Sequence, residues 1–420
     1  MCSVLNRLRV MGQCNMAPSN RRLNGWMIAL MPYSIAIGPL GTLLTLEIAS
    51  LRGSPVDVSY AMSAGSAAGV IAPLMWGFLL DRYGGRRVLA LGFLGTSIFM
   101  LALTYVNAIP QISLFYAAAS LFSSAVGVST SLMVISSSSK DKWSEGYSRL
   151  NFISSLGYLI GDLAAAALSS ILSIRLIILL MGLLPTASTA WLMLTMPSEG
   201  KVTRRSGGYR QIKRVVNTGD LAYVFTLYTA LIVFYVSSGI FNTLYPYGLR
   251  EGGLSKTWVM LIISAGLGVQ ILGFRVAPLI IRRLGGDAKA ASRSLILRGL
   301  SYALIGLTSS TPSSLVITGL TLYPLAAGIA FSTFYTASSI MVFERLNHGE
   351  EGKGIGVYNV VTGSAYLTGS FASGYLASAI GIGQSYIVAG VMLLGSAYLF
   401  NRVSEGTTSV LEVARLRSEG

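Results

Sequence analysis

Charged residues are scarce in this sequence. Asp, Glu, Lys and Arg together make up only 11% of its 420 residues, whereas hydrophobic residues make up 53%; an ordinary soluble domain is about 25% charged. Because apolar area left in water is unfavourable, so few charges cannot cover the surface of a soluble domain. Short alternating segments are also missing, which excludes a porin-type barrel. The sequence therefore predicts an all-α polytopic membrane protein.

Residues that support catalysis or metal binding are equally rare. The only histidine is His348, in a predicted loop, and both cysteines, Cys2 and Cys14, lie in the N-terminal tail. This excludes a disulfide framework and a histidine-based metal site. The absence of a Gly-x-x-x-x-Gly-Lys-Ser/Thr loop argues against ATP hydrolysis. We expect no cofactor, no metal and no enzyme activity. The tail also lacks the apolar core of a signal peptide, and Met16 is an alternative start to Met1.

Long apolar runs dominate what the sequence does contain. A helix needs about 20 apolar residues to cross about 30 Å of hydrocarbon, and twelve such runs predict two six-helix pseudo-repeats. We expect one bundle over 26–196 and a second over 220–401, a cytoplasmic linker at 197–219, and cytoplasmic tails at 1–25 and 402–420. The predicted helices lie near residues 26–50, 58–80, 88–107, 111–136, 150–171, 175–196, 220–247, 257–281, 293–310, 314–342, 355–379 and 383–401.

Short basic clusters between the apolar runs carry the net charge of +15. Clusters of this kind set the orientation of a membrane protein, and they do not form a basic face for nucleic acid. If both chain ends are cytoplasmic, the outer loops contain only Arg52, Arg175, Arg250 and Lys256 of the 31 Lys and Arg residues. The sequence thus predicts a multi-pass protein of the cell membrane with both termini inside, surrounded by lipid and without a nucleic-acid partner.

The two halves of the sequence repeat one another. A segment of the first half matches a segment 208 residues later, and residues 79–85 resemble residues 280–286, both ending in Gly-Gly. Each match joins an inner loop to the same run of its half, as expected for parallel repeats. The identities in the longer match are Gly146 with Gly354, Asn151 with Asn359, Tyr158 with Tyr366, Leu159 with Leu367, and Gly161 with Gly369.

The loop after the second run reads GFLLDRYGGRR over residues 77–87. It resembles the signature loop of the major facilitator superfamily, Gly-x-x-x-Asp-Arg-x-Gly-Arg-Arg/Lys-Arg/Lys. Gly85 stands where the family usually has Arg, and the copy in the second half has Arg282 at the position of Asp81. The residues that match are Gly77, Asp81, Arg82, Gly84, Arg86 and Arg87.

The resemblance implies a gating role for this loop. In the family, the acid corresponding to Asp81 faces the start of the eleventh helix, which is near Gly354 here. A carboxylate favours Arg partners and the N-terminal end of a helix, so Asp81 and Arg82 would stabilise the state that is shut on the inner side. The alternative is a basic cytoplasmic loop with one stray acid. Gly77 would permit a close approach of two helices.

Glycines at helical spacing predict close helix contacts elsewhere. Gly65 and Gly69 lie four residues apart in the second run, as Gly157 and Gly161 do in the fifth. Small residues at this spacing let membrane helices approach one another closely. The Gly-Pro step at residue 38 predicts a packing kink in the first run, with local loosening of the helix as the alternative.

Asp162 is the acid nearest the centre of a predicted span. An acid at mid-bilayer costs about 2.5–3.5 kcal/mol on insertion scales, so it marks a candidate functional site. We hypothesise that Asp162 binds a proton or a cationic group. The alternative is a protonated Asp hydrogen-bonded to a neighbouring helix. The polar residues that share its helical face are Asn151, Ser155, Tyr158 and Ser169.

The first and seventh runs supply the other candidates for a substrate or proton site. Tyr33 shares a face with Glu47, for which a solvated acid at the outer edge near Arg52 is the alternative. The seventh run has a wet, aromatic face that suits a cavity for a neutral or amphiphilic solute; the alternative is packing together with an interfacial aromatic belt. The residues of this face are Tyr228, Tyr235, Ser238, Asn242 and Tyr245.

No Lys or Arg lies at the centre of a predicted span, because Arg275 and Arg298 are assigned to inner helix ends. This argues against a buried site for phosphates or dicarboxylates. The sequence therefore predicts a secondary active transporter that moves a small neutral, amphiphilic or cationic solute by alternating access, with the proton as a candidate coupling ion. The alternatives are a non-transporting receptor or assembly partner on the same scaffold, or a membrane-embedded enzyme.

Overall fold

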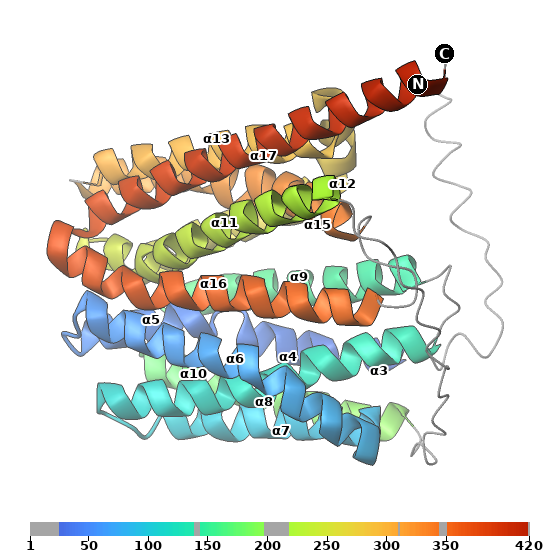
Figure 1. The fold of residues 1–420 in the computed structure, drawn as a ribbon. Helices are drawn as coiled ribbons and strands as arrows, with labels where there is room; N and C mark the ends of the chain where they lie inside the picture. Colours follow the sequence, from blue (N-terminus) through green and yellow to red (C-terminus); the bar gives the residue numbers. More distant parts are fainter. Residues whose placement is uncertain (1–24, 138–142, 197–217, 310, 344–350, 419–420) are drawn as a thin grey trace, which may run out of the picture.

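The computed structural model describes residues 25–137, 143–196, 218–309, 311–343 and 351–418. In these residues every regular element is a helix (Figure 1). The first half contains α3 (Gly25–Ile28), α4 (Leu30–Ile37), α5 (Leu40–Ser50), α6 (Pro55–Tyr83), α7 (Gly85–Leu103), α8 (Ile109–Ser137), α9 (Trp143–Leu168) and α10 (Ile174–Thr195). The second half contains α11 (Thr218–Glu251), α12 (Lys256–Leu284), α13 (Asp287–Leu307), α14 (Pro312–Tyr323), the π-helix η3 (Pro324–Ala330), α15 (Phe331–Phe343), α16 (Glu351–Ile380) and α17 (Ile382–Ser418).

These elements form twelve transmembrane segments, six in each half. Helices α3 to α5 make up the first segment, and α14, η3 and α15 make up the tenth. Ten of the twelve are long and apolar enough to cross a membrane by length and composition alone. The other two are α13, which carries several charged residues, and α16, which is rich in Gly, Ser and Tyr. The predicted all-α fold of two six-helix pseudo-repeats is confirmed.

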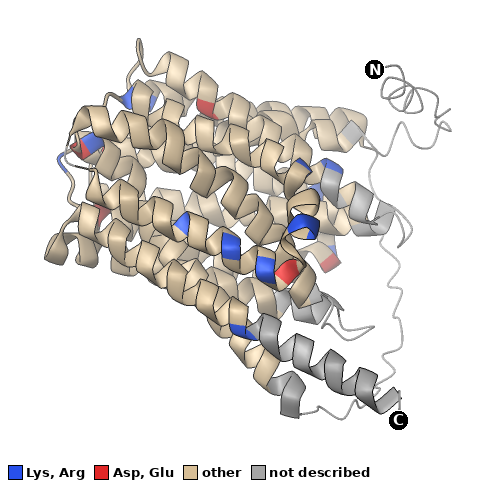
Figure 2. Ribbon diagram, turned by 90° about the horizontal axis from the view of Figure 1, so that it is seen from above, with Lys and Arg blue, Asp and Glu red and all other residues tan. Residues whose placement is uncertain are grey.

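The outer surface of the bundle is apolar. Large side chains that a soluble protein would bury are largely exposed, such as Leu74 at 74%, Phe225 at 73% and Leu194 at 85%. Helices satisfy their own backbone hydrogen bonds, so such a surface is stable in hydrocarbon. Lys and Arg instead gather toward one end of the bundle and are sparse at the other (Figure 2). We call the end where α6 meets α7 the basic end, and the end where α5 meets α6 the far end.

In the first half, the first and fifth segments meet through glycines. A Cβ atom added at Gly161 of α9 would lie closer than 3.0 Å to the carbonyl oxygen of Ile35 in α4, and one added at Gly38 would lie 2.7 Å from the Cα of Tyr158. Gly157 also lies against α4, at Ser34. Without side chains at these positions, the two backbones can touch, as the sequence predicts for Gly157 and Gly161.

The second half repeats this contact between α11 and α16. A Cβ atom at Gly369 would lie closer than 3.0 Å to the carbonyl oxygen of Val236, and one at Gly239 would lie equally close to that of Tyr366. Tyr366 and Gly369 are the sequence matches of Tyr158 and Gly161. The internal repeat is therefore a repeat of helix packing, and not only of composition.

Two of the glycines predicted to allow close helix contacts do not do so. Gly65 packs tightly against the ring of Tyr116, as expected, whereas an added Cβ at Gly69 or Gly77 would meet no described atom within 4 Å. Neither glycine makes a close helix contact in this structure, because both face away from α7 and α8, on which this part of α6 packs through Trp76 and Leu80. Phe78 on this part of α6 is 69% exposed.

In the described residues, the hydrogen bonds between the two halves lie from the middle of the bundle to its far end. The hydroxyls of Tyr60 and Tyr375 are 2.9 Å apart between α6 and α16, and Tyr247 donates to the carbonyl of Gly53 at 3.0 Å. A third contact joins the hydroxyls of Ser169, just after α9, and Thr257 on α12, also at 3.0 Å. Toward the basic end, the Cζ atom of Arg275 on α12 lies 5.6 Å from the ring centre of Phe152 on α9, whereas α6 exposes Phe78 and α16 exposes Val357. The hydrogen bonds that join the halves in the described residues are therefore concentrated toward the far end.

Candidate central binding site

Two adjoining cavities of about 300 and 350 Å³ lie between the two halves. Both are lined by Ile263 and Gln270 of α12, Tyr323 of α14 and Ala327 of η3. Their size is that of a site for a small molecule. The first cavity is completed by Thr42, Asn242, Tyr245, Pro246, Arg298 and Phe331, and the second by Ile37, Gly38, Tyr158, Asp162 and Leu267.

Asp162 lies on the wall of the second cavity. It is only 3% exposed, and its Oδ1 atom has no hydrogen-bond partner. The tight α4–α9 contact positions it, since Gly157 and Gly161 press one face of α9 onto α4 and turn the adjacent face, with Tyr158 and Asp162, toward the cavity. A buried acid that no protein group satisfies is available to a proton or a ligand.

The wall next to Tyr158 is a break in the first transmembrane segment. Helix α4 ends at Ile37 and α5 begins at Leu40, while the Gly38 N–H still donates to the carbonyl of Ser34 at 3.0 Å. Pro39 has no N–H to donate, so the helical ladder is interrupted at this step. The helix is interrupted at the step where the sequence predicts a kink, and Gly38 lies directly on the cavity.

Arg298 lies on the wall of the first cavity, and this overturns its assignment to an inner helix end. Helix α13 begins at Asp287, six residues before the predicted start of the run, so Arg298 is about 16 Å along the helix. It is 3% exposed. The prediction was wrong because the hydropathy of a run containing Lys289 and Arg293 does not show where its helix begins. The prediction that no buried cation stands at mid-span is also wrong.

Aromatic rings hold the Arg298 guanidinium in place. Its Nε atom donates to the hydroxyl of Tyr302 at 2.9 Å, and its Cζ atom lies 5.3 Å from the ring centre of Phe234 and 5.1 Å from that of Phe331. Cation–π contacts of this kind stabilise a desolvated guanidinium by about 2 kcal/mol or more. The Nη1 atom is buried and has no hydrogen-bond partner, so the guanidinium retains unused donor capacity next to the cavity that Arg298 lines.

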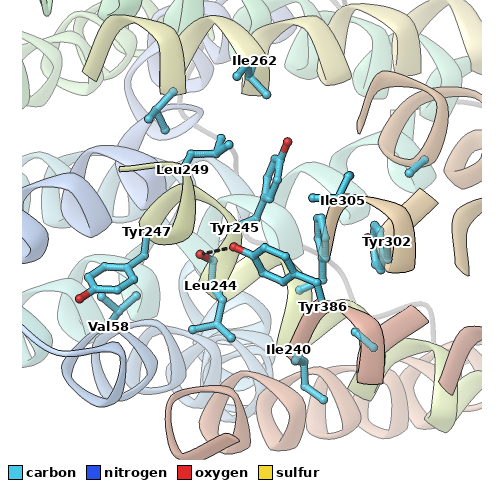
Figure 3. Close-up of a cluster of buried hydrophobic side chains, with 14 of the residues drawn as sticks. Val58, Ile240, Leu244, Tyr245, Tyr247, Leu249, Ile262, Tyr302, Ile305 and Tyr386 are labelled. Atoms are coloured by element: carbon cyan, nitrogen blue, oxygen red, sulfur yellow. Dashed lines mark hydrogen bonds between the residues drawn. The ribbon is translucent and has the colours of Figure 1, made fainter. Parts of the chain in front are cut away.

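Tyr245 of α11, Tyr302 of α13 and Tyr386 of α17 lie in one buried cluster (Figure 3), and Tyr245 also lines this cavity. The rings of Phe241 and Tyr302 are parallel with centres 3.5 Å apart, and Tyr386 donates to the carbonyl of Leu244 at 3.2 Å. The hydroxyl of Tyr245 points away from Tyr386 and has no partner (Figure 3). It is a third unsatisfied polar atom on the cavity wall. Tyr245 therefore lines the site. The sequence alone does not distinguish this position from a place in an interfacial aromatic belt.

The tenth segment contains a π-helix where it meets the cavity. Pro324 begins η3 and lacks the N–H that an α-helix would use, and Ala327 in its middle lines both cavities. A Cβ added at Gly328 would lie 2.5 Å from the Val269 side chain, so η3 packs tightly on α12. Short π-helices inside α-helices are frequent at functional sites.

The remaining predicted candidates separate into two groups. Tyr158 and Asn242 line the cavities together with Asp162. Tyr33 instead packs between helices, with its hydroxyl 2.5 Å from Ser123 Oγ, and Tyr235 forms a 3.1 Å hydroxyl contact with Tyr358. Tyr228 is half-buried on α11 and does not line either cavity.

Glu47 has a partner within its own half. Its Oε1 atom accepts from Arg175 Nε at 2.6 Å, and the same guanidinium also bonds to Asn107. These groups tie the first and sixth segments to the loop before α8 at the far end. Glu47 does not line either cavity. It is buried and paired with Arg175, so it is neither a lining residue nor the solvated acid near Arg52 that the sequence offered as the alternative.

The signature-like loop lies at the basic end. Gly84 has φ 83°, a conformation that favours glycine, and it separates α6 from α7. Arg86 Nη2 donates to the carbonyl of Met193 at 3.0 Å, which fixes the start of α7 to the end of α10. Asp81 and Arg82 are exposed, as is Arg87. The surroundings of Gly354, where Asp81 is expected to bind, lie outside the described residues.

Comparisons with known proteins bear on this arrangement. A family profile described as Major Facilitator Superfamily matches residues 26–323, whereas no curated protein sequence gives a match. Among solved structures, the nucleoside transporter NupG has a TM-score of 0.72 at 14% identity, covering 91% of this chain and 99% of that one. A POT family transporter in complex with 5-aminolevulinic acid has a TM-score of 0.75 at 14% identity, covering 92% of this chain and 96% of that one. A bacterial homologue of the human lysosomal transporter Spinster, in an inward-facing and occupied conformation, has a TM-score of 0.72 at 12% identity, covering 93% of this chain and 98% of that one.

Proposed function

Since the chain belongs to the major facilitator superfamily, we propose that it is a secondary active transporter that carries a small solute through the central cavities by alternating access. The observation that carries this proposal is the position of these cavities. Asp162 of the first half and Arg298 of the second half line adjoining spaces, so a solute there would touch both halves. A site shared by two packed repeats is the arrangement that rocking of the repeats can expose to each side in turn.

The contacts between the halves support such a motion. The far end is held by hydroxyl contacts such as those of Tyr60 with Tyr375 and Tyr247 with Gly53. Neutral hydrogen bonds contribute only about 1 kcal/mol each, so a few of them can break during transport. Closure at the basic end would then bring Asp81 and Arg82 toward the start of α16, as the resemblance of their loop implies.

The distribution of charge gives the proposed orientation. We assign the basic end, with Arg82, Arg86 and Arg87, to the cytoplasm, and the far end to the outside of the cell membrane. Lys and Arg accumulate in cytoplasmic loops. Both chain ends would then be cytoplasmic, and the state described here would be closed toward the outside.

The lining of the cavities limits the solute. Tyr158, Asn242 and Tyr245 provide hydroxyl and amide groups next to aromatic surface, as expected for a neutral or amphiphilic solute. Asp162 can receive a cationic group or a coupling proton. Arg298 additionally provides a place for an anionic group, so the argument against anionic groups no longer holds. The structural neighbours include proteins described as transporters of nucleosides and as binding 5-aminolevulinic acid.

A test of this proposal does not require the solute to be known. Ala327 lines both cavities, whereas the adjacent Ala326 is fully buried. With Cys2 and Cys14 replaced by Ser, we expect A327C to react with a membrane-impermeant thiol reagent from either face of oriented membrane vesicles, and A326C to react from neither. Mass spectrometry of the labelled protein measures both. Labelling of A327C from one face only would contradict alternating access and favour a non-transporting receptor.

A further inference from the structure

Two buried charges of opposite sign line the central cavities, and neither is neutralised by the protein. Asp162 and Arg298 are both 3% exposed, and each retains an atom without a hydrogen-bond partner, Oδ1 and Nη1 respectively. No ion pair within 4.0 Å joins them. The one ion pair found within the described part of the chain is that of Glu47 with Arg175. The two charges therefore stand apart across the site.

Two buried charges without partners cost free energy that the packing of the helices alone would not require. A charged side chain at the bilayer centre costs about 2.5–3.5 kcal/mol on insertion scales, and buried charges in proteins are normally paired. Aromatic contacts stabilise Arg298 in part, but they leave its buried Nη1 atom without a hydrogen-bond partner beside the cavity. Asp162 has no comparable support. We therefore expect the groups that pair with Asp162 and Arg298 to belong to the ligand.

The internal repeat shows that the scaffold does not need these charges. The match of residues 79–85 with 280–286 places Ser97 at the position of Arg298, and the longer match places Ser370 at that of Asp162. Both serines are satisfied within their own half. Ser97 donates to the carbonyl of Gly182 at 2.6 Å, and Ser370 accepts from Thr243 at 2.8 Å. Each charge is thus an asymmetric addition to a position that a neutral, hydrogen-bonded side chain fills in the other half.

We infer that the central site binds a zwitterionic solute, with its ammonium group at Asp162 and its carboxylate at Arg298. This inference rests on the transport function proposed above. Gln270 and Tyr323 line both the cavity of Asp162 and that of Arg298, and Phe331 and Tyr245 supply apolar surface for the body of the solute. A guanidinium binds a carboxylate strongly through charge-assisted hydrogen bonds. The class of solute is a small amino acid or short peptide with an apolar side chain.

Matched compounds test the inference directly. Phenylalanine and the dipeptide alanyl-phenylalanine can each be prepared as the zwitterion, the N-acetylated anion, the amidated cation and the doubly blocked neutral form. Binding of the eight compounds to the purified full-length protein is measured by calorimetry. We expect a zwitterion to bind best, and blocking either of its charged groups to weaken binding at least tenfold.

Single substitutions then assign the two charged groups. In D162N, acetylation of the amine should no longer matter, whereas amidation of the carboxylate still should. In R298Q, the pattern should be the opposite. R293Q is the matched control, because Arg293 is exposed on the same helix as Arg298. If a variant does not fold, the comparison of the eight compounds on the unchanged protein still decides the question.

Three results would overturn the inference. They are binding of a cation or an anion as tight as that of the zwitterion, loss of the same preference in both variants, and failure of all eight compounds to bind. None of these would contradict transport itself, because the labelling of A327C tests alternating access without a ligand. Labelling of A327C from both faces together with no zwitterion binding would retain the transporter and discard the solute class.

Discussion

Replacing Gly161 or Gly369 by alanine should lower the free energy of unfolding by at least about 3 kcal/mol, the upper range for an overpacked core. In each case the added Cβ would lie closer than 3.0 Å to a backbone carbonyl oxygen, that of Ile35 or Val236, and a carbonyl within a helix cannot move aside as a side-chain tip can. The helices would have to separate. Unfolding of the purified variants in mixed detergent micelles measures the effect.

Gly69→Ala is the matched control for both variants. Gly69 is also a helical glycine in an apolar segment, but an added Cβ meets no described atom within 4 Å. Alanine is the better helix former by about 1 kcal/mol, so this variant should be as stable as the parent protein or slightly more stable. Equal losses of stability in all three variants would contradict this account, because they would show that the losses do not come from the α4–α9 and α11–α16 contacts.

Asp162→Asn should stabilise the protein while impairing its function. The substitution removes an ionisable group from the middle of the membrane but keeps the shape of the side chain. We expect a gain of about 1 kcal/mol, because the asparagine amide is itself polar and also costs free energy to bury. Residues held for binding rather than for folding commonly show this trade-off. The measurement is the melting temperature in detergent at neutral pH.

The direction of this change separates the two interpretations of Asp162. If Asp162 were a protonated acid that holds two helices together, asparagine would weaken a structural hydrogen bond and the melting temperature would fall. Glu251→Gln is the control, because Glu251 is an exposed acid at the far end, where removal of its charge should have little effect. A loss of stability specific to D162N would contradict its assignment to a binding site.

Much of the fold follows from local sequence, because a helix in hydrocarbon must be long and apolar. The apolar runs predicted twelve spans, including α13 and α16, whose charged or polar residues keep them below a strict hydropathy threshold. Helical spacing also brought Tyr158 and Asp162 onto one face, and both line the cavity. These features depend on periodicity within one segment, which the sequence records directly.

What the sequence did not reveal depends on contacts between distant segments. The ion pair of Glu47 with Arg175 joins residues 128 positions apart. The depth of Arg298 depends on where α13 begins and on rings from α11 and α15, so a run of mixed hydropathy concealed a residue that lines the cavity. Gln270 gave an unused signal, since an amide inside an apolar run already marks a candidate cavity residue.

Distances between the halves in a membrane test the central claim most directly. Spin labels at Phe78 of α6 and Val357 of α16 report on the basic end, and labels at Ser170 and Glu251 report on the far end, since all four positions are exposed. Pulsed electron paramagnetic resonance on protein in lipid nanodiscs should show two populations for each pair. Conditions that shorten the Phe78–Val357 distance should lengthen the Ser170–Glu251 distance. A single, unchanging distance at both ends, or changes of the same sign, would contradict rocking of the two halves about the central cavities.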